Sequence, residues 1–256
     1  IICANSTTIP LLISPEVSEQ QGIEITQRTG AAIVQSAPVS GQYLQLSATG
    51  LALCDNDQSK HRLRIDFTEG RQGFRLRQRG QAREGIVRAC GMGKAPGIQI
   101  VDATAGLGHD AFVLASHGAY VTMLERSAVV AALLDDGLQR ARCDGAHEII
   151  ERLTLIHTEA IEWLTRQDWP AADVIYLDPM YRPARRKAAA AKPLAILEKL
   201  LEQQQQNDAA LLNTALQAAG KRVVVKRQRL APTLGQAQPN FSLNGRSTRF
   251  DVYIPG

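Results

Sequence analysis

Carboxylates and a pair of glycines are spaced along the middle of the chain in a way that could bind a small polar ligand. The stretch VDATAGLGHDAF begins at Val101 and carries Asp102, Gly106 and Gly108 between an apolar run and a helix-like run. Glycines at such a junction let the backbone turn tightly and approach a ligand, and the following helix offers unpaired N–H groups. A tight turn without a ligand would have the same sequence, so this stretch alone leaves both interpretations open.

Two further carboxylates follow the next apolar runs. Glu125 closes YVTMLE, 17 positions after Gly108, where it could accept hydrogen bonds from both hydroxyls of a ribose. Glu159 follows LTLIHT and could accept from an adenine amino group, while the N–H of Ala160 could reach a ring nitrogen. Taken by itself, Glu159 is also an ordinary acid at the start of a helix. Together with the glycine loop, these residues predict a ligand that contains adenosine.

The charge of the glycine loop favours one adenosine cofactor over another. Asp102 precedes the glycines and Asp110 follows them. A pyrophosphate favours a loop without carboxylates, whereas two carboxylates suit the sulfonium and ammonium groups of S-adenosylmethionine. The loop also has Asp110 and Ala111 where a nicotinamide-binding loop has its third glycine. We therefore expect S-adenosylmethionine, with S-adenosylhomocysteine as the product, and keep a nicotinamide-dependent oxidoreductase as the alternative.

The stretch VIYLDPMYRP places Asp178, Pro179 and Tyr181 just after a fourth apolar run. In a doubly wound sheet this strand lies beside the first, so Asp178 would face the reactive end of the cofactor. The residues resemble the [DNS]PP[YF] tetrad of amino-group methyltransferases, in which the first side chain and the carbonyl beside proline align an exocyclic amine. Tyr181 could stack on an extruded base, worth ~1–3 kcal/mol. A plain Asx-Pro turn at a strand end is the alternative.

Basic residues follow the tetrad in the order Arg182, Arg185, Arg186, Lys187 and Lys192. Such runs are often solvated faces, but beside a site that extrudes a base we expect contacts with RNA phosphate. The charges of KRVVVKR, which begins at Lys221, flank an apolar strand. We interpret them as ordinary residues at the edge of that strand.

The pattern of apolar residues predicts two parts in the chain. Residues 1–75 contain short runs at near period two (GIEITQ, AAIVQS, YLQLSA, LALCDN and HRLRIDF), which predict a small β-rich N-terminal domain. The Gly- and Arg-rich segment TEGRQGFRLRQRGQAREG is typical of a linker or a binding loop. Strand-like and helix-like runs alternate over residues 76–256, which predicts an α/β domain with a mostly parallel, doubly wound sheet.

Individual elements can be assigned within this second part. Strands are predicted in GIQIVDATAG, AYVTMLE, RLTLIHTEA, ADVIYLDPM, KRVVVKRQ and STRFDVYIPG. Helices are predicted in EGIVRACGM, GHDAFVLASHG, SAVVAALLDDGLQRAR and AIEWLTRQ, and one or two helices in the region 195–220. Ser127 and Gly118 are expected to cap helices. The segment RLAPTLGQAQPNFSLNG is too rich in Pro and Gly for a helix, so the last two strands should form an antiparallel pair.

The chain resembles the ribosomal RNA small subunit methyltransferase J family, which methylates N2 of a guanine in 16S rRNA. The resemblance is carried by VDATAGLGHDAFVLASHGAYVTMLERSAVVAALLDDGL, YLDPMY, KRVVVKR and RFDVY. It implies a class I, Rossmann-like fold with a seven-stranded sheet, and 16S rRNA or the small ribosomal subunit as partner. It also implies that His109, Asp110, Glu125, Arg126, Glu159, Ala160 and Asp178 line the cofactor site. The chemistry of the tetrad would equally serve adenine N6 or cytosine N4.

Composition excludes several other classes of protein. The 256 residues carry a formal net charge of +4, which is compatible with a polyanionic partner. The four cysteines are scattered without ligand spacing, so we expect reduced thiols in a cytoplasmic protein and no metal site. No apolar run reaches the ~18 residues that span a bilayer, and the first residues lack the basic region of a signal peptide. A non-catalytic RNA-binding module with a vestigial cofactor site is a third hypothesis.

Overall fold

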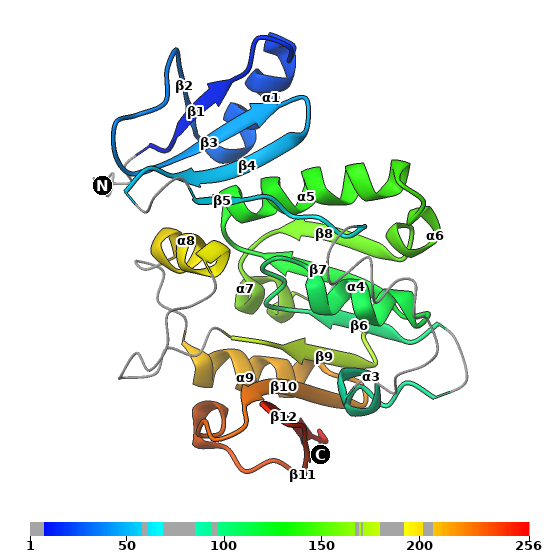
Figure 1. Cartoon of the computed structure of the whole chain (residues 1–256). Helices are drawn as coiled ribbons and strands as arrows, with labels where there is room; N and C mark the ends of the chain where they lie inside the picture. Colours follow the sequence, from blue (N-terminus) through cyan, green and yellow to red (C-terminus); the bar gives the residue numbers. More distant parts are fainter. Residues whose placement is uncertain are drawn as a thin grey trace. The chain divides into compact units, whose positions relative to one another are not determined.

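The structure is a computed structural model that describes residues 8–57, 61–68, 85–93, 97–166, 169, 171–179, 192–201 and 207–255 (Figure 1). The chain divides into two compact units. The first unit comprises residues 1–65, 128–140 and 185–204, and the second comprises 66–127, 141–184 and 205–256. The predicted linker or binding loop at 69–84 and the basic residues 182–187 lie outside the described residues. Among the described helices, none combines the length and apolar character needed to cross a membrane.

The first unit is built on a five-stranded sheet, in which the predicted apolar runs account for four strands and the strand at residues 10–13 was not predicted. The strands are β1 (Pro10–Ile13), β2 (Ala32–Val34), β3 (Gln42–Ser47), β4 (Gly50–Asp55) and β5 (His61–Leu63), in the order β2-β1-β3-β4-β5. β1 pairs in parallel with β2 and β3, whereas the β3–β4 and β4–β5 pairs are antiparallel. The β-rich character expected for the N-terminal part is therefore confirmed.

One predicted strand of this unit is wrong, because GIEITQ lies inside the helix α1 (Glu19–Thr29). Ser18 begins that helix with a capping box, in which its hydroxyl accepts from the N–H of Gln21 and the Gln21 side chain accepts from the N–H of Ser18. Gly30 ends it in the left-handed conformation at φ 69°. Caps at both ends satisfy backbone groups that a strand would leave to a partner, and they outweigh the β-branched residues between them.

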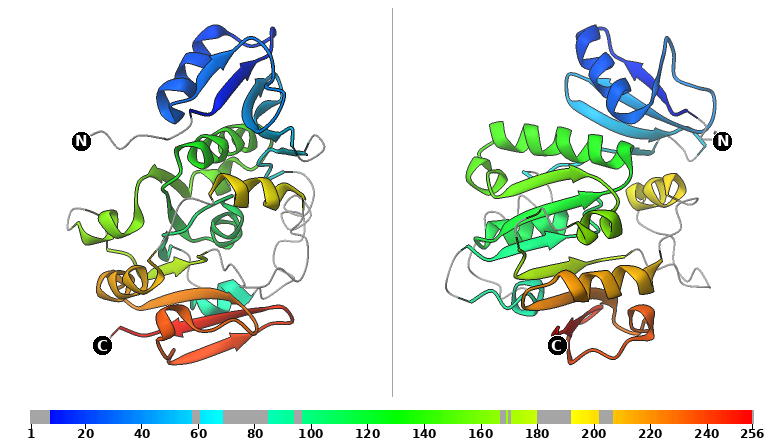
Figure 2. Two further views of the ribbon diagram at one scale, coloured as in Figure 1. Left: turned by 90° about the vertical axis from the view of Figure 1, so that its left-hand side faces the viewer. Right: turned by 180° about the vertical axis from the view of Figure 1, so that it is seen from behind.

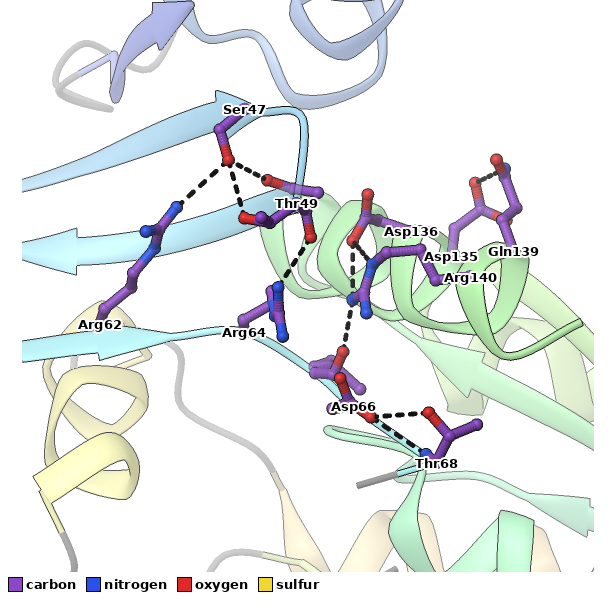
Figure 3. A network of polar contacts seen from close by, with 12 residues as sticks. Ser47, Thr49, Arg62, Arg64, Asp66, Thr68, Asp135, Asp136, Gln139 and Arg140 are labelled. Carbon is purple, nitrogen blue, oxygen red and sulfur yellow. Dashed lines mark hydrogen bonds and ion pairs between the residues drawn. The ribbon is translucent and has the colours of Figure 1, made fainter. Parts of the chain in front are cut away.

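Two helical segments belong to the same unit. They are α5 (Ala128–Cys143) as far as Arg140, and α8 (Lys192–Leu200). The guanidinium of Arg140 bonds to Asp136 at 3.0 Å and to the carbonyl of Ile65 (Figure 3). A Cβ atom at Gly50 would stand 2.6 Å from the Arg140 side chain, so this turn needs a glycine.

The second unit is an α/β fold with a seven-stranded sheet. Its strands are β6 (Gln99–Asp102), β7 (Tyr120–Glu125), β8 (Leu153–His157), β9 (Val174–Leu177), β10 (Arg222–Gln228), β11 (Phe241–Asn244) and β12 (Thr248–Tyr253). The order is β11-β12-β10-β9-β6-β7-β8, and the pairs from β10 to β8 are all parallel. This arrangement confirms the predicted Rossmann-like sheet, with the fourth strand β9 beside the first strand β6.

The C-terminal end of this sheet is antiparallel, as predicted, but it has one more strand than the apolar runs indicate. β12 lies between β10 and β11 and is antiparallel to both. β11 comes from the Pro- and Gly-rich segment in which no helix was expected, and the same segment contains the short 3-10 helix η1 (Leu234–Gln236). The apolar pattern of β11 is weak in the sequence because Phe241 and Asn244, at the two ends of the strand, are exposed.

Helices cover both faces of the seven-stranded sheet (Figures 1 and 2). α7 (Ala160–Thr165) and α9 (Asp208–Ala218) pack on one face, with Trp163 and Leu211 buried against Ile175, Leu177 and Val225 of the strands. α3 (Gly85–Ala89) and α4 (His109–Ser116) lie on the other face. Side chains alternate between the two faces of a sheet along each strand. The residues at 102, 176 and 226 each follow a residue of this core in the sequence, so they point toward the face that α4 covers.

Candidate functional site

Four predicted acidic residues gather at one edge of the seven-stranded sheet. β6 ends at Asp102 and β7 ends at Glu125, while Asp178 follows the last residue of β9. Glu159 stands two residues after β8, immediately before α7. Because β6 to β9 run in parallel, their carboxyl ends lie at the same edge, where α/β proteins bind ligands.

The loop between β6 and α4 adopts the glycine-dependent turn that its sequence predicts. Gly106 and Gly108 have φ values of 51° and 72°, in the left-handed region that favours glycine. The N–H of Gly108 donates to the carbonyl of Ala105 at 2.8 Å, and a Cβ at Gly106 would meet only the carbonyl of Thr104 at 3.8 Å. The backbone at Gly106 can therefore be approached closely by a ligand.

Glu125 is tied to this loop. Its side chain accepts from the N–H of Gly106 at 3.0 Å through Oε2 and from the N–H of Ser127 at 2.7 Å through Oε1. Burial raises the pKa of Glu125, and these two N–H groups partly oppose that effect. A carboxylate oxygen has two lone pairs, so each oxygen can still accept one hydroxyl of a ribose.

Asp102 is the most deeply buried acid of this edge, with 2% of its surface exposed. It accepts a hydrogen bond from the N–H of Thr104 at 3.1 Å. Burial raises the pKa of Asp102 to about 8, against 3.8 ordinarily. At neutral pH the residue therefore holds a proton and can both donate and accept.

Lys226 brings two of the predicted carboxylates together. Its ammonium lies 2.6 Å from Oδ2 of Asp110 and 2.8 Å from Oδ2 of Asp178. The hydroxyl of the buried Tyr176 donates to the same oxygen of Asp110 at 2.6 Å. The interpretation of the KRVVVKR charges as ordinary edge residues is thus wrong for Lys226. Strand alternation places Lys226 on the same face as Val224 and opposite to Val225, but the carboxylates that it meets depend on the neighbouring strands.

Asp178 is fixed through its backbone as well as its side chain. Its N–H donates to the hydroxyl of Thr104 at 2.6 Å, and the following Pro179 is buried. The pKa of Asp178 is raised by burial, although 39% of its side chain is exposed, and Lys226 works against this rise. Tyr181, Arg182, Arg185, Arg186 and Lys187 lie outside the described residues.

The remaining predicted residues lie at the same edge without joining the carboxylate group. Glu159 accepts from the N–H of Glu162 at 3.0 Å and so caps α7, of which Ala160 is the first residue. His109 is exposed at the start of α4, and its ring stands edge-on to Phe67 with centroids 6.3 Å apart. The carbonyl of Arg126 bonds to His157 at 3.2 Å.

These residues fit S-adenosylmethionine. Glu125 is available for ribose hydroxyls, and the carboxylates of Asp110 and Asp178 suit a cationic ligand better than a phosphate. Asp102, which is protonated at neutral pH, adds a neutral donor and acceptor. The glycine at position 106 keeps the backbone of the loop approachable for such a ligand.

Comparisons with known proteins agree with this chemistry. A family model described as "Putative SAM-dependent methyltransferase" matches residues 27–255. The ribosomal RNA small subunit methyltransferase J of Laribacter hongkongensis is 41% identical over 96% of this chain and 86% of its own length. The protein of the same name from Alkalilimnicola ehrlichii is 46% identical over 82% of this chain and 81% of its own length.

The solved structures include a similar protein too. The crystal structure of a SAM-dependent methyltransferase from Neisseria gonorrhoeae is 34% identical, with a TM-score of 0.76 and 96% of each chain covered. The match to the family model extends over the glycine loop and the strand that leads to Asp178. The chain therefore belongs to the ribosomal RNA small subunit methyltransferase J family and is an S-adenosylmethionine-dependent methyltransferase.

Proposed function

We propose that the protein transfers a methyl group from S-adenosylmethionine to the exocyclic N2 amine of a guanine in 16S rRNA. The observation that carries this proposal is the position of Asp178. It stands at the carboxyl end of β9, beside the glycine loop that follows β6, and it is held by Thr104 and Lys226. The names of the relatives support small-subunit rRNA as the substrate.

The cofactor site in this proposal comprises the residues of the glycine loop and the strand ends. Glu125 would hold the ribose hydroxyls, and Glu159 with the N–H of Ala160 would meet the adenine. The further residues of the site are Asp102, Gly106, Gly108, His109, Asp110, Arg126 and Asp178. When bound, S-adenosylmethionine supplies an electrophilic methyl group on its sulfonium sulfur.

Asp178 would act on the amine in two ways. The lone pair of an aromatic exocyclic amine is delocalised, so an acceptor that binds its N–H can turn the remaining electron density toward the methyl group. Pro179 fixes the backbone beside it and leaves a neighbouring carbonyl as a second acceptor. As the new N–C bond forms, the amine proton becomes acidic. The raised pKa of Asp178 suits it to accept that proton.

The other parts of the chain would serve the RNA. Tyr181 would stack on the extruded base, and Arg182, Arg185, Arg186 and Lys187 would contact phosphates. We also propose residues 1–75 as a separate small domain and 76–256 as the methyltransferase domain. The support is that one sheet ends at Leu63 and the other begins at Gln99. Ribosomal RNA as substrate implies a location in the cytoplasm.

The proposal can be tested with purified protein and a donor that carries an isotopically labelled methyl group. Small ribosomal subunits and naked 16S rRNA, both from a strain that lacks the protein, would be treated in parallel and digested for mass spectrometry of nucleosides. We expect labelled N2-methylguanosine from at least one substrate. Label in N6-methyladenosine or N4-methylcytidine would correct the base, and label in no nucleoside would contradict the proposed activity.

A further inference from the structure

We propose that Lys226 is a positioning residue for methyl transfer, which holds Asp178 as an ionised and oriented acceptor for the target amine. This inference deepens the proposed function and rests on it. Lys226 does not reach the amine itself in this proposal. It acts through the carboxylate that does.

The contacts of Lys226 leave one oxygen of Asp178 available. Its ammonium lies 2.8 Å from Oδ2 of Asp178, and none of the described residues forms a hydrogen bond with Oδ1. On its other side, the ammonium is held by Oδ2 of Asp110 at 2.6 Å, an oxygen that the hydroxyl of Tyr176 also fixes at 2.6 Å. The Lys226 side chain is 29% exposed and that of Asp178 39%, so the pair is partly shielded from solvent. Oδ1 of Asp178 therefore has a defined direction.

The sheet itself brings these side chains together. Val225 on β10 is paired in register with Leu177 on β9, so Lys226 and Asp178 are the next residues along two parallel, adjacent strands. Val224 is paired with Tyr176, so the strand alternation puts Tyr176 and Lys226 on the face that carries Asp110. The arrangement depends on tertiary register rather than on any local motif.

The charges around Asp178 make the role of Lys226 measurable. Burial raises the pKa of Asp178, Lys226 lowers it, and Asp110 raises it. Among the described residues, the ionisable groups that act electrostatically on Asp178 are Lys226 and Arg227 from β10, Asp110 from α4, Asp102 from β6 and Tyr176 from its own strand. Loss of Lys226 should therefore move the titration of Asp178 to higher pH, and loss of the Asp110 charge should move it to lower pH.

The first measurement is the titration of Asp178 in the free full-length protein, followed by NMR of 13C-labelled aspartate carboxyl groups. The Asp178 signal would be assigned by its loss in Asp178→Asn. We expect it to titrate at higher pH in Lys226→Met, near the wild-type pH in Lys226→Arg, and at lower pH in Asp110→Asn. An unchanged titration in Lys226→Met would overturn the inference. If that variant fails to fold in a thermal denaturation check, Lys226→Gln replaces it.

The second measurement is the single-turnover rate against pH at saturating cofactor and RNA. Lys226→Met should lose about 10²-fold at pH 7, in line with a misplaced reacting group, and should recover part of this loss as pH rises. Lys226→Arg should keep most of the rate. If the wild type is active and Lys226→Met has the same rate, the proposed role of Lys226 is overturned and the proposed function still stands. A wild type that methylates no nucleoside would instead overturn the proposed function.

Discussion

The backbone N–H of Asp178 donates a hydrogen bond of 2.6 Å to the hydroxyl of Thr104. This bond joins the end of β9 to the loop that follows β6, while the N–H of Thr104 donates to Asp102. The same threonine thus links the glycine loop to the residue proposed to bind the amine. A change at Thr104 should affect the chemical step through the position of Asp178.

Thr104→Val tests that link, because valine keeps the shape of threonine and removes the hydroxyl. The N–H of Asp178 would then lose its partner, and we expect the single-turnover rate to fall by ~10- to 10²-fold through lost alignment. Thr104→Ser keeps the hydroxyl and is the matched control, with a rate close to wild type. Equal rates for the valine and serine variants would show that the hydrogen bond does not position Asp178.

Glu125→Ala should weaken the binding of S-adenosylmethionine by ~1–3 kcal/mol, the range for hydrogen bonds to a charged group. Calorimetry with the intact cofactor and with an analogue that lacks the ribose hydroxyls separates two causes. If Glu125 binds the ribose, the substitution should weaken binding of the intact cofactor and barely change binding of the analogue. An equal loss for both ligands would mean that Glu125 only supports the loop through Gly106 and Ser127.

Asp102 makes a prediction about stability and pH. Folded Asp102 keeps its proton up to about pH 8, whereas the unfolded chain releases it near the ordinary value of 3.8. Between these values the folded state binds the extra proton, so this residue lowers the free energy of unfolding as pH rises, by at most ~1.4 kcal/mol for each pH unit. Its effect levels off above about pH 8.

Asp102→Asn imitates the protonated side chain and removes this dependence. Urea unfolding at pH 5 and at pH 8.5 should show the variant gaining stability relative to wild type by a few kcal/mol between the two conditions. Burial also raises the pKa values of Glu125 and Asp178, but they are present in both proteins and cancel in the comparison. A constant difference between the two proteins would contradict a raised pKa at Asp102.

Replacement of Arg185, Arg186 and Lys187 with alanine should weaken RNA binding across sequences. Each lost phosphate contact should reduce the slope of log affinity against log salt by ~0.7–0.9. The affinity for S-adenosylmethionine serves as the control and should stay the same, because these residues are proposed to meet only RNA. An unaltered salt slope would identify this tract as an ordinary solvated surface.

The sequence is informative where a local pattern determines the structure. Carboxylates that follow apolar runs, such as Asp102 and Glu125, could be placed at strand ends because strand and helix alternate and parallel strands share one carboxyl edge. The helix α1 could also have been found, since Ser18 and Gln21 have the spacing of a capping box. Its β-branched residues suggested a strand instead.

The features that the sequence does not predict depend on contacts between distant parts of the chain. Lys226 contacts Asp110 across more than a hundred residues of chain, and only the register of β10 with β9 reveals it. β11 is short and partly exposed, and it exists because β12 offers a free edge to pair with. The raised pKa values of Asp102 and Asp178 likewise follow from burial in the folded sheet, which the residue types do not determine.

The most direct test of the proposed methylation and of the role of Asp178 is the nucleoside composition of 16S rRNA. The rRNA comes from a strain that lacks the protein, complemented with either wild type or Asp178→Ala. Mass spectrometry should show N2-methylguanosine reduced in the deletion, restored by the wild type, and not restored by Asp178→Ala at equal protein level. Asp178→Asn keeps one acceptor oxygen and should restore part of it. Unchanged N2-methylguanosine in the deletion strain, or full restoration by Asp178→Ala, would contradict the account.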